Sequence, residues 1–172
     1  MTDRQEKKTQ FESKKKKNPL VLLVLTLAVV AVAGVVGWIA TGGDNEKYPL
    51  VSNVQGELAI PLRQVDDGKA HFFSYQSGET TVDFFVLKSD DGVVRVALDT
   101  CDVCYRDRKG YRQEGDFMVC NNCNQKFRSD MINEIKGGCN PAPVGRNIVD
   151  GKVIIAEADL VNGARFFKGP NK

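Results

Sequence analysis

The chain has 172 residues, 42% of them hydrophobic, which suits one soluble domain with a tail and is ordinary for a globular protein. Its formal net charge of +2 is unevenly distributed, because residues 1–17 carry seven Lys or Arg against three acidic residues. These bases lie beside an apolar stretch and not on a folded face, so they do not indicate a nucleic-acid partner. No Walker motif or dinucleotide-binding glycine motif is present, which leaves no sign of a nucleotide cofactor.

Residues 20–40 form an uncharged apolar run. A helix of this length, rising ~1.5 Å per residue, just crosses a hydrocarbon layer of ~30 Å, so we expect a transmembrane anchor. Residues 1–19 are then a basic cytoplasmic tail, because positively charged flanks stay on the cytoplasmic side. This predicts a single-pass cell-membrane protein with an extracytoplasmic C-terminal domain. The stretch Ala31-Val32-Ala33 also has the form of a signal-peptidase site, which leaves cleavage of the anchor open.

A polar, glycine-containing linker is expected at residues 41–54 and the folded domain at residues 55–168. Four short runs in this domain are rich in β-branched and aromatic residues, as strands are: 57–62, 70–75, 80–87 and 93–98. Glycine-containing turns separate them, which predicts an antiparallel meander. Period-two alternation predicts an inner face of Phe73, Val82, Phe84, Val86, Val94 and Val96. The expected fold class is therefore mainly β with minor α.

Beyond residue 98 the secondary-structure signals are weaker. Residues 106–115 are too charged for a core helix, whereas 117–119 and 153–155 have the apolar, β-branched character of strands. Residues 130–135 are weakly helical and are followed by two glycines. This part of the chain is expected to be organised by its cysteines.

All five cysteines lie between residues 99 and 143. Cys101 and Cys104 form one C-x2-C pair, Cys120 and Cys123 form a second, and fifteen residues separate the pairs. This is the spacing of a two-knuckle metal site. A C-x2-C turn places two thiolates on one side of a tight loop, so two facing turns supply four sulfurs to one tetrahedral centre. Zinc and an iron-sulfur cluster both fit this donor set.

Other uses of these cysteines fit less well. Disulfides are usual outside the cytoplasm, but five is an odd number and two-residue loops make strained, reducible bridges. A thiol-disulfide oxidoreductase is an alternative, although neither C-x2-C pair lies in the βαβ context that lowers a thiol pKa. Haem attachment is excluded, because Tyr105 and Asn124 follow the pairs where histidine is required. A metal-binding protein without catalysis is favoured, and a zinc-stabilised structural or interaction domain is its main alternative.

Five further residues are candidates for the same site. Cys139 lies fifteen residues after Cys123 in a Gly-Cys-Asn-Pro turn, and is either a fifth ligand or a packed residue. His71 is the only histidine and is either a ligand or a packed strand residue. Asp99 and Asp102 flank the first knuckle, as turn formers or as acceptors behind the ligands. Tyr111 is expected to cover the site from solvent.

A set of motifs resembles a known family. They are the run Ala97-Leu98-Asp99-Thr100-Cys101-Asp102-Val103-Cys104, then Gly110-Tyr111, Gly115-Asp116, Val119-Cys120-x-x-Cys123, Phe127 and Gly137-Gly138-Cys139-Asn140-Pro141. Over residues 55–167 the chain resembles the FtrD-like membrane iron-sulfur-containing proteins. The resemblance implies metal handling beside iron-uptake permeases and cupredoxin-like or other redox partners, with the cysteines as ligands of an iron-sulfur cluster, zinc or copper. Larger relatives carry several transmembrane helices where this chain has one predicted span.

Overall fold

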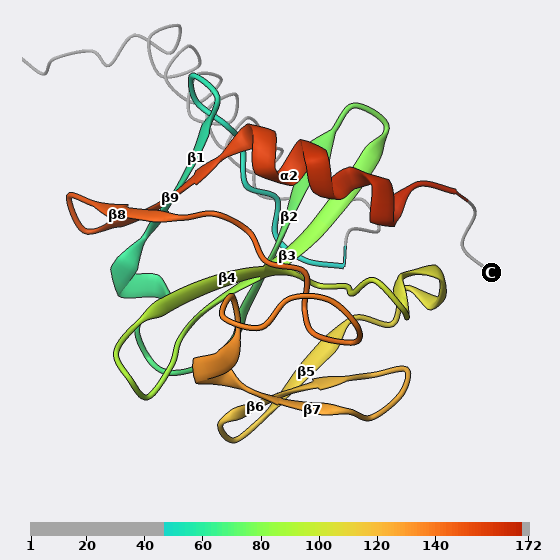
Figure 1. Ribbon diagram of the computed structural model, residues 1–172. Coiled ribbons are helices and arrows are strands. Elements are labelled where there is room, and N and C mark those ends of the chain that lie inside the picture. The colour runs from blue at the N-terminus through green and yellow to red at the C-terminus, as the bar shows by residue number, and fades with distance from the viewer. Residues whose placement is uncertain (1–46, 170–172) are drawn as a thin grey trace, which may run out of the picture. The chain divides into compact units, whose positions relative to one another are not determined.

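The computed structural model describes residues 47–169 of the chain (Figure 1). The predicted cytoplasmic tail at 1–19, the predicted membrane anchor at 20–40 and the first part of the predicted linker lie outside these residues. Between residues 47 and 169, no helix has the length and apolar character needed to cross a membrane. The described part consists of short antiparallel strands and one α-helix. This confirms a mainly β fold with minor α.

The central sheet is the antiparallel meander that the sequence predicted. It contains three strands, β2 (His71–Ser77), β3 (Thr80–Lys88) and β4 (Val94–Leu98). Ser77 pairs with Thr80 in a tight hairpin, and Gly78 in its turn has a φ of +59°. Glycine adopts this left-handed conformation at no steric cost, which is why the turn forms here. Both hairpins of the meander therefore lie where the sequence placed them.

A second antiparallel sheet joins segments from the two ends of the described chain. It has the order β1 (Glu57–Pro61), β9 (Lys152–Ala156) and β8 (Asn147–Val149). The prediction that residues 57–62 belong to the meander is wrong, because β1 pairs with β9. Sequence-adjacent strands are usually spatial neighbours, and this rule fails where a later strand supplies the matching apolar face. Here Leu58 and Ile60 are buried together with Val153 and Ile155 of β9.

The third sheet is small and follows the first cysteine pair. Its strands are β5 (Tyr111–Glu114), β6 (Phe117–Cys120) and β7 (Lys126–Arg128). The chain ends in α2 (Glu157–Gly163) and a 3-10 turn at Ala164–Phe167. The predicted helix at residues 130–135 is reduced to a 3-10 turn at Ser129–Met131. Figure 1 shows β5, β6 and β7 (yellow to orange) on one side of β4 and α2 (red) on the other.

The central sheet is buried on both faces, because strand β3 contributes to two apolar clusters. Phe84 and Val86 belong to the first core, which lies toward β1, β9 and α2. Phe85 and Leu87 belong to the second core, which lies toward β5 and β6. All four side chains are fully buried. A strand covered on both sides is apolar at consecutive positions, so alternation reveals only one of its faces.

The predicted inner face corresponds to the first core. Its buried members from the central sheet are Tyr75, Val82, Phe84, Val86, Val94, Val96 and Leu98, with Phe73 packed against them. The second core consists of Phe85, Leu87, Ala97, Cys101, Tyr111, Met118, Cys120 and Ile132. Two of its eight buried residues are cysteines. The sulfur chemistry is therefore part of the packing that joins the third sheet to the central one.

The chain just before β1 packs on the central sheet. The backbone N–H of Val51 donates to the Ser74 carbonyl at 2.8 Å, and the Ser74 N–H donates to the Pro49 carbonyl at 2.9 Å. The ring of Tyr48 stacks on Phe72 with centroids 4.9 Å apart. Residues 47–51, which fall in the predicted linker, thus extend the domain toward its N-terminal side.

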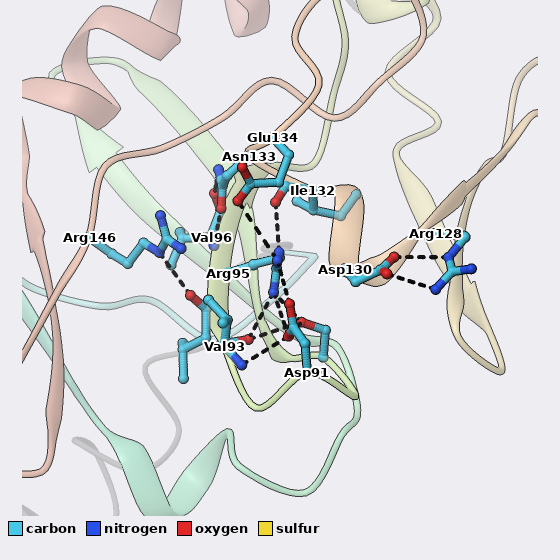
Figure 2. A network of polar contacts seen from close by, with 12 residues as sticks. Asp91, Val93, Arg95, Val96, Arg128, Asp130, Ile132, Asn133, Glu134 and Arg146 are labelled. Atoms are coloured by element: carbon cyan, nitrogen blue, oxygen red, sulfur yellow. Dashed lines mark hydrogen bonds and ion pairs between the residues drawn. The ribbon is translucent and has the colours of Figure 1, made fainter.

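Arg95 fastens the loop after β7 to the central sheet (Figure 2). Its side chain is 3% exposed, and its Nε donates to the Ile132 carbonyl at 2.9 Å. Its two terminal nitrogens donate to the two carboxylate oxygens of Asp91 at 2.9 and 2.8 Å. Asn133 adds a bond from its Nδ2 to the Val96 carbonyl at 2.8 Å. This network fixes the start of the segment that leads to Cys139.

Candidate metal centre

The first cysteine pair follows directly after β4. Cys101 is 1% exposed and Cys104 is half-buried. The backbone N–H of Cys104 donates to the Cys101 sulfur at 3.2 Å. Such a bond folds the four residues into a tight turn with both sulfurs on one side, as the spacing predicted. The turn continues into a 3-10 segment at Tyr105–Asp107.

The second pair begins at the last residue of β6. Cys120 is 2% exposed and pairs with Tyr111 across the hairpin, whereas Cys123 is exposed. The backbone N–H of Asn124 donates to the Cys120 carbonyl at 2.9 Å, which closes the turn. Asn124 has a φ of +58°, a conformation that asparagine tolerates better than most residues. The residue that follows the second pair therefore shapes its knuckle.

Cys139 reaches the two pairs from a separate loop. Gly137 and Gly138 both have positive φ, at +85° and +64°, and the Asn140 N–H donates to the Gly137 carbonyl at 3.3 Å. The Tyr111 hydroxyl donates to the Cys139 carbonyl and so anchors the loop to β5. The result is a distance of 4.0 Å between the sulfurs of Cys139 and Cys104. The Gly-Gly-Cys-Asn-Pro motif thus brings the fifth cysteine beside Cys104 of the first pair and Cys123 of the second.

The five sulfurs form two groups that share one member. Cys101, Cys104 and Cys120 have sulfurs within 4.8 Å of one another, and so do Cys104, Cys123 and Cys139. We call them the inner group and the outer group. All five cysteines are free thiols. The sulfurs of a disulfide are ~2.05 Å apart, so the 4.0 Å between Cys104 and Cys139 suits common ligation of a metal ion.

The pKa values of Cys104 and Cys120 argue against an activated thiol at either residue. Burial raises the pKa of the Cys120 thiol to about 11. At Cys104 a hydrogen bond from Asn122 lowers the pKa, but burial and the charge of Cys101 outweigh it and raise the value to about 11. A nucleophilic cysteine requires a lowered pKa. A cation bound among these sulfurs supplies the positive charge that thiolate formation needs.

In the outer group, the pKa values of Cys123 and Cys139 are shifted in opposite directions. A backbone hydrogen bond from Gln125 lowers the pKa of Cys123. Burial raises the pKa of Cys139. Cys123 therefore loses its proton more readily than Cys139, and its side chain is also exposed to solvent.

Asp99 supports the first pair from behind. Its side chain is 1% exposed, and its Oδ1 accepts the Tyr111 N–H at 2.6 Å. Its Oδ2 accepts from Lys47 Nζ at 2.7 Å and from the Tyr48 hydroxyl at 3.1 Å. Burial raises the pKa of Asp99, while Lys47 acts in the opposite direction. Asp99 is therefore a buried acceptor that joins β4, β5 and the segment before β1, and not simply a turn former. Asp102, by contrast, is exposed.

His71 lies apart from the cysteines. Its Nε2 is 2.7 Å from Asp67 Oδ1, and the pair is solvent-exposed. Neighbouring residues of a strand lie on opposite faces of the sheet. Because Phe72 packs on the second core, which contains Cys101 and Cys120, His71 lies on the face away from these cysteines. Neither sulfur group includes it.

Tyr111, in contrast, lies within the second core and is 3% exposed. Burial is the main cause that raises the pKa of Tyr111, and the neighbouring Cys101 raises it further.

Asn140 is a residue of this region that the sequence reasoning did not single out. It follows Cys139 and is 6% exposed. Within the described residues, its Oδ1 is the buried side-chain polar atom that has no hydrogen-bond partner. A buried side-chain acceptor without a partner is uncommon in native proteins, so Asn140 is an unusual residue directly beside Cys139. Its place directly after the cysteine of the Gly-Gly-Cys-Asn-Pro turn was the available signal.

A β domain that gathers five free cysteines in this way has the donor set of a thiolate metal site and could hold a metal ion. The comparison with family models gives the family: the chain belongs to the membrane iron-sulfur containing protein FtrD-like family, whose model matches residues 65–167. No curated protein matches the chain.

Among solved structures, the chain is similar to a quaternary ammonium Rieske monooxygenase, CntA, in a crystal structure with an inhibitor. The identity is 12% and the TM-score 0.39, with 66% of this chain and 32% of the monooxygenase chain covered. The chain thus spans about a third of that protein. At this level the similarity bears on neither the fold nor the function.

Proposed function

We propose that the protein is a membrane-anchored, extracytoplasmic metal or iron-sulfur protein that serves as a redox or metal-delivery accessory of an iron-uptake system. The observation that carries the proposal is the convergence of five free cysteine sulfurs into two overlapping groups. Membership of a family described as membrane iron-sulfur proteins supports the choice of cofactor. An iron permease and cupredoxin-like or other redox proteins are the proposed partners.

The donor set fits the proposed cofactor. Thiolate sulfur is the ligand of iron-sulfur clusters and of structural zinc, and all five candidate ligands here are cysteines. Cys101, Cys104 and Cys120 would hold the buried side of a bound group, and Cys123 and Cys139 the side nearer solvent. An iron-sulfur cluster supplies one-electron transfer. The exposed Cys123 then provides the edge at which electrons or ions reach a partner.

The space at the site supports an accessory role more than catalysis on an organic substrate. The cavity lined by Cys101, Cys104 and Cys120 has a volume of about 10 Å³. Roughly one water-sized sphere occupies such a volume. A metal ion among the sulfurs suits this space, whereas an organic molecule does not.

A zinc-stabilised structural domain is the second candidate. The third sheet favours it, because β5, β6 and β7 have only four, four and three residues. Sheets this small rarely persist without further support, and a structural zinc ion contributes folding free energy directly. In this case the cysteines hold the third sheet in place and transfer nothing.

Anaerobic purification of the full chain, followed by visible absorption and elemental analysis, separates the candidates. A brown protein that contains iron and acid-labile sulfide is expected. A colourless protein with stoichiometric zinc would support the structural domain instead. Absence of bound metal from both wild type and a sample reconstituted with iron and sulfide would contradict both. In a cell lacking the protein, slower growth under iron limitation is expected, restored by wild type and not by Cys120→Ser.

A further inference from the structure

We propose that the five cysteines form a two-ion centre in which the Cys104 thiolate bridges an inner and an outer thiophilic metal ion. Cys101 and Cys120 complete the inner site, and Cys123 and Cys139 complete the outer site. The proposal rests on the proposed function only in that the cysteines bind metal. It goes further in assigning two ions, the bridging residue and a different exposure for each ion.

The grouping of the sulfurs is the first support. Sulfurs bound at ~2.3 Å to one ion lie about 4 Å apart. The structure does not gather the four knuckle sulfurs into one such set but produces two sets of three. Cys104 is the one residue common to both, and its sulfur is 4.0 Å from that of Cys139. A thiolate has enough lone pairs to bind two ions, so the shared position is that of a bridge.

The number of ligands is the second support. A tetrahedral ion takes four thiolates, which would leave one of the five without a role. The fifth cysteine is held near the others by specific contacts, since the Tyr111 hydroxyl binds the Cys139 carbonyl and two glycines with positive φ shape its turn. Two ions that share Cys104 use every sulfur. Each site then has three thiolates and a fourth position for an exogenous ligand.

The burial of the ligands distinguishes the two sites. Cys101 and Cys120 are 1% and 2% exposed, and the small cavity of about 10 Å³ lies beside them. Cys123 is exposed and Cys139 is half-buried. An ion in the inner site is therefore enclosed by the second core, whereas an ion in the outer site faces solvent. The inner ion is the retained one, and the outer ion is the one that exchanges with an incoming partner.

The test uses the full chain in detergent, reduced, metal-free and without sulfide, titrated with Cd²⁺ under anaerobic conditions. Leaving out sulfide restricts the count to ions that the thiolates hold by themselves, and so tests the two-site arrangement whether or not the iron ions of the proposed cofactor also carry sulfide. Bound Cd²⁺ is counted by elemental analysis after gel filtration. We expect two equivalents for wild type and one for Cys139→Ser. The matched control is His71→Ala, which removes the histidine outside both groups and is expected to keep two equivalents.

The outcomes separate the two proposals. One equivalent in both wild type and Cys139→Ser would overturn the two-ion centre and leave a single four-sulfur site, with the proposed function intact. Zero equivalents in wild type would contradict metal binding itself. Loss of the second ion in His71→Ala would assign that ion to a histidine site and overturn the bridge. If Cys139→Ser does not fold, ¹¹³Cd NMR of wild type decides: two resonances of equal intensity are expected, and a single one refutes the proposal.

Discussion

The carboxylate of Asp99 occupies the space that a side chain at position 110 would fill. A Cβ added to Gly110 would lie 2.2 Å from Asp99 Oδ2, and Gly110 has a φ of +66°. Asp99 does not move away easily, because its other oxygen accepts the Tyr111 N–H at 2.6 Å. Glycine is therefore required at position 110 for both conformational and steric reasons, and the Gly-Tyr pair brings β5 against the first knuckle.

The first prediction compares two glycine substitutions. Gly110→Ala should destabilise the domain by about 3 kcal/mol or more, because an unfavourable left-handed backbone adds to a steric clash with a buried carboxylate. Gly115→Ala is the control, since Gly115 has a φ of +56° and no atom within 4 Å of its added Cβ. It should cost only about 1 to 2 kcal/mol. Urea denaturation measures both, and equal losses would show that Asp99 moves away.

The second prediction concerns Arg95. Arg95→Ala removes the donors to the Ile132 carbonyl and to the Asp91 carboxylate (Figure 2). Because a buried acceptor is left unpaired, we expect a loss of about 2 to 3 kcal/mol in the free energy of unfolding. Arg128→Ala is the control: its ion pair with Asp130 is exposed and should contribute less than about 1 kcal/mol. Similar losses in the two variants would refute a special role of Arg95.

The third prediction concerns acid stability. Hydrogen bonds from Arg95, the Val93 N–H and Ser89 hold the pKa of Asp91 well below its usual range. A carboxyl group with a lowered folded-state pKa stabilises the protein fully above its ordinary pKa of ~3.9, and this contribution is lost progressively as pH falls from there through the folded-state value. Asp91→Asn should therefore lose less stability than wild type between pH 7 and pH 3. Any metal lost in acid is expected to be lost alike from both proteins, because Asp91 belongs to neither group of cysteines. Parallel declines of the two urea midpoints would contradict the prediction.

The central sheet was predictable because its strands are consecutive. Period-two alternation placed Phe84 and Val96 on neighbouring strands of one core. Both side chains are fully buried, and β3, which carries Phe84, pairs with β4, which carries Val96. The same rule could not identify Phe85 and Leu87 as core residues of a second layer. Their partners are in β5 and β6, and the charged sequence of β5 gives little sign of a strand. The pairing of β1 with β9 was missed for the same reason, since it depends on residues distant in the sequence.

The cysteine spacing predicted the turns better than it predicted the grouping. A C-x2-C pair fixes its own two sulfurs through local backbone bonds, such as that from the Cys104 N–H to the Cys101 sulfur. Which pairs meet depends on the loop that carries Cys139 and on the contacts of Asp99 and Tyr111. The spacing favoured four knuckle sulfurs, whereas the structure places Cys139 in a group with Cys104 and Cys123. Ligation by these residues stays a prediction.

The fourth prediction concerns removal of the proposed metal. The second core has eight buried residues, two of them cysteines, whereas the first core has fifteen and contains none. Because metal binding and local folding are coupled, a strong chelator under reducing conditions should loosen the third sheet and leave β1 and β9 intact. Losing only ~1.4 kcal/mol of local stability speeds amide exchange about tenfold. We therefore expect faster exchange at Arg112 and Val119, which pair across β5 and β6.

The reference amides for this experiment are those of Leu58 and Ile155, which pair across β1 and β9 and lie in the first core. They should exchange at the same rate with and without chelator, and Cys120→Ser without chelator should show the pattern of the chelated wild type. Equal acceleration in both sheets would mean that the metal stabilises the whole domain as one unit. No acceleration at Val119 would mean that the packing of Met118, Tyr111 and Ile132 holds the third sheet without metal.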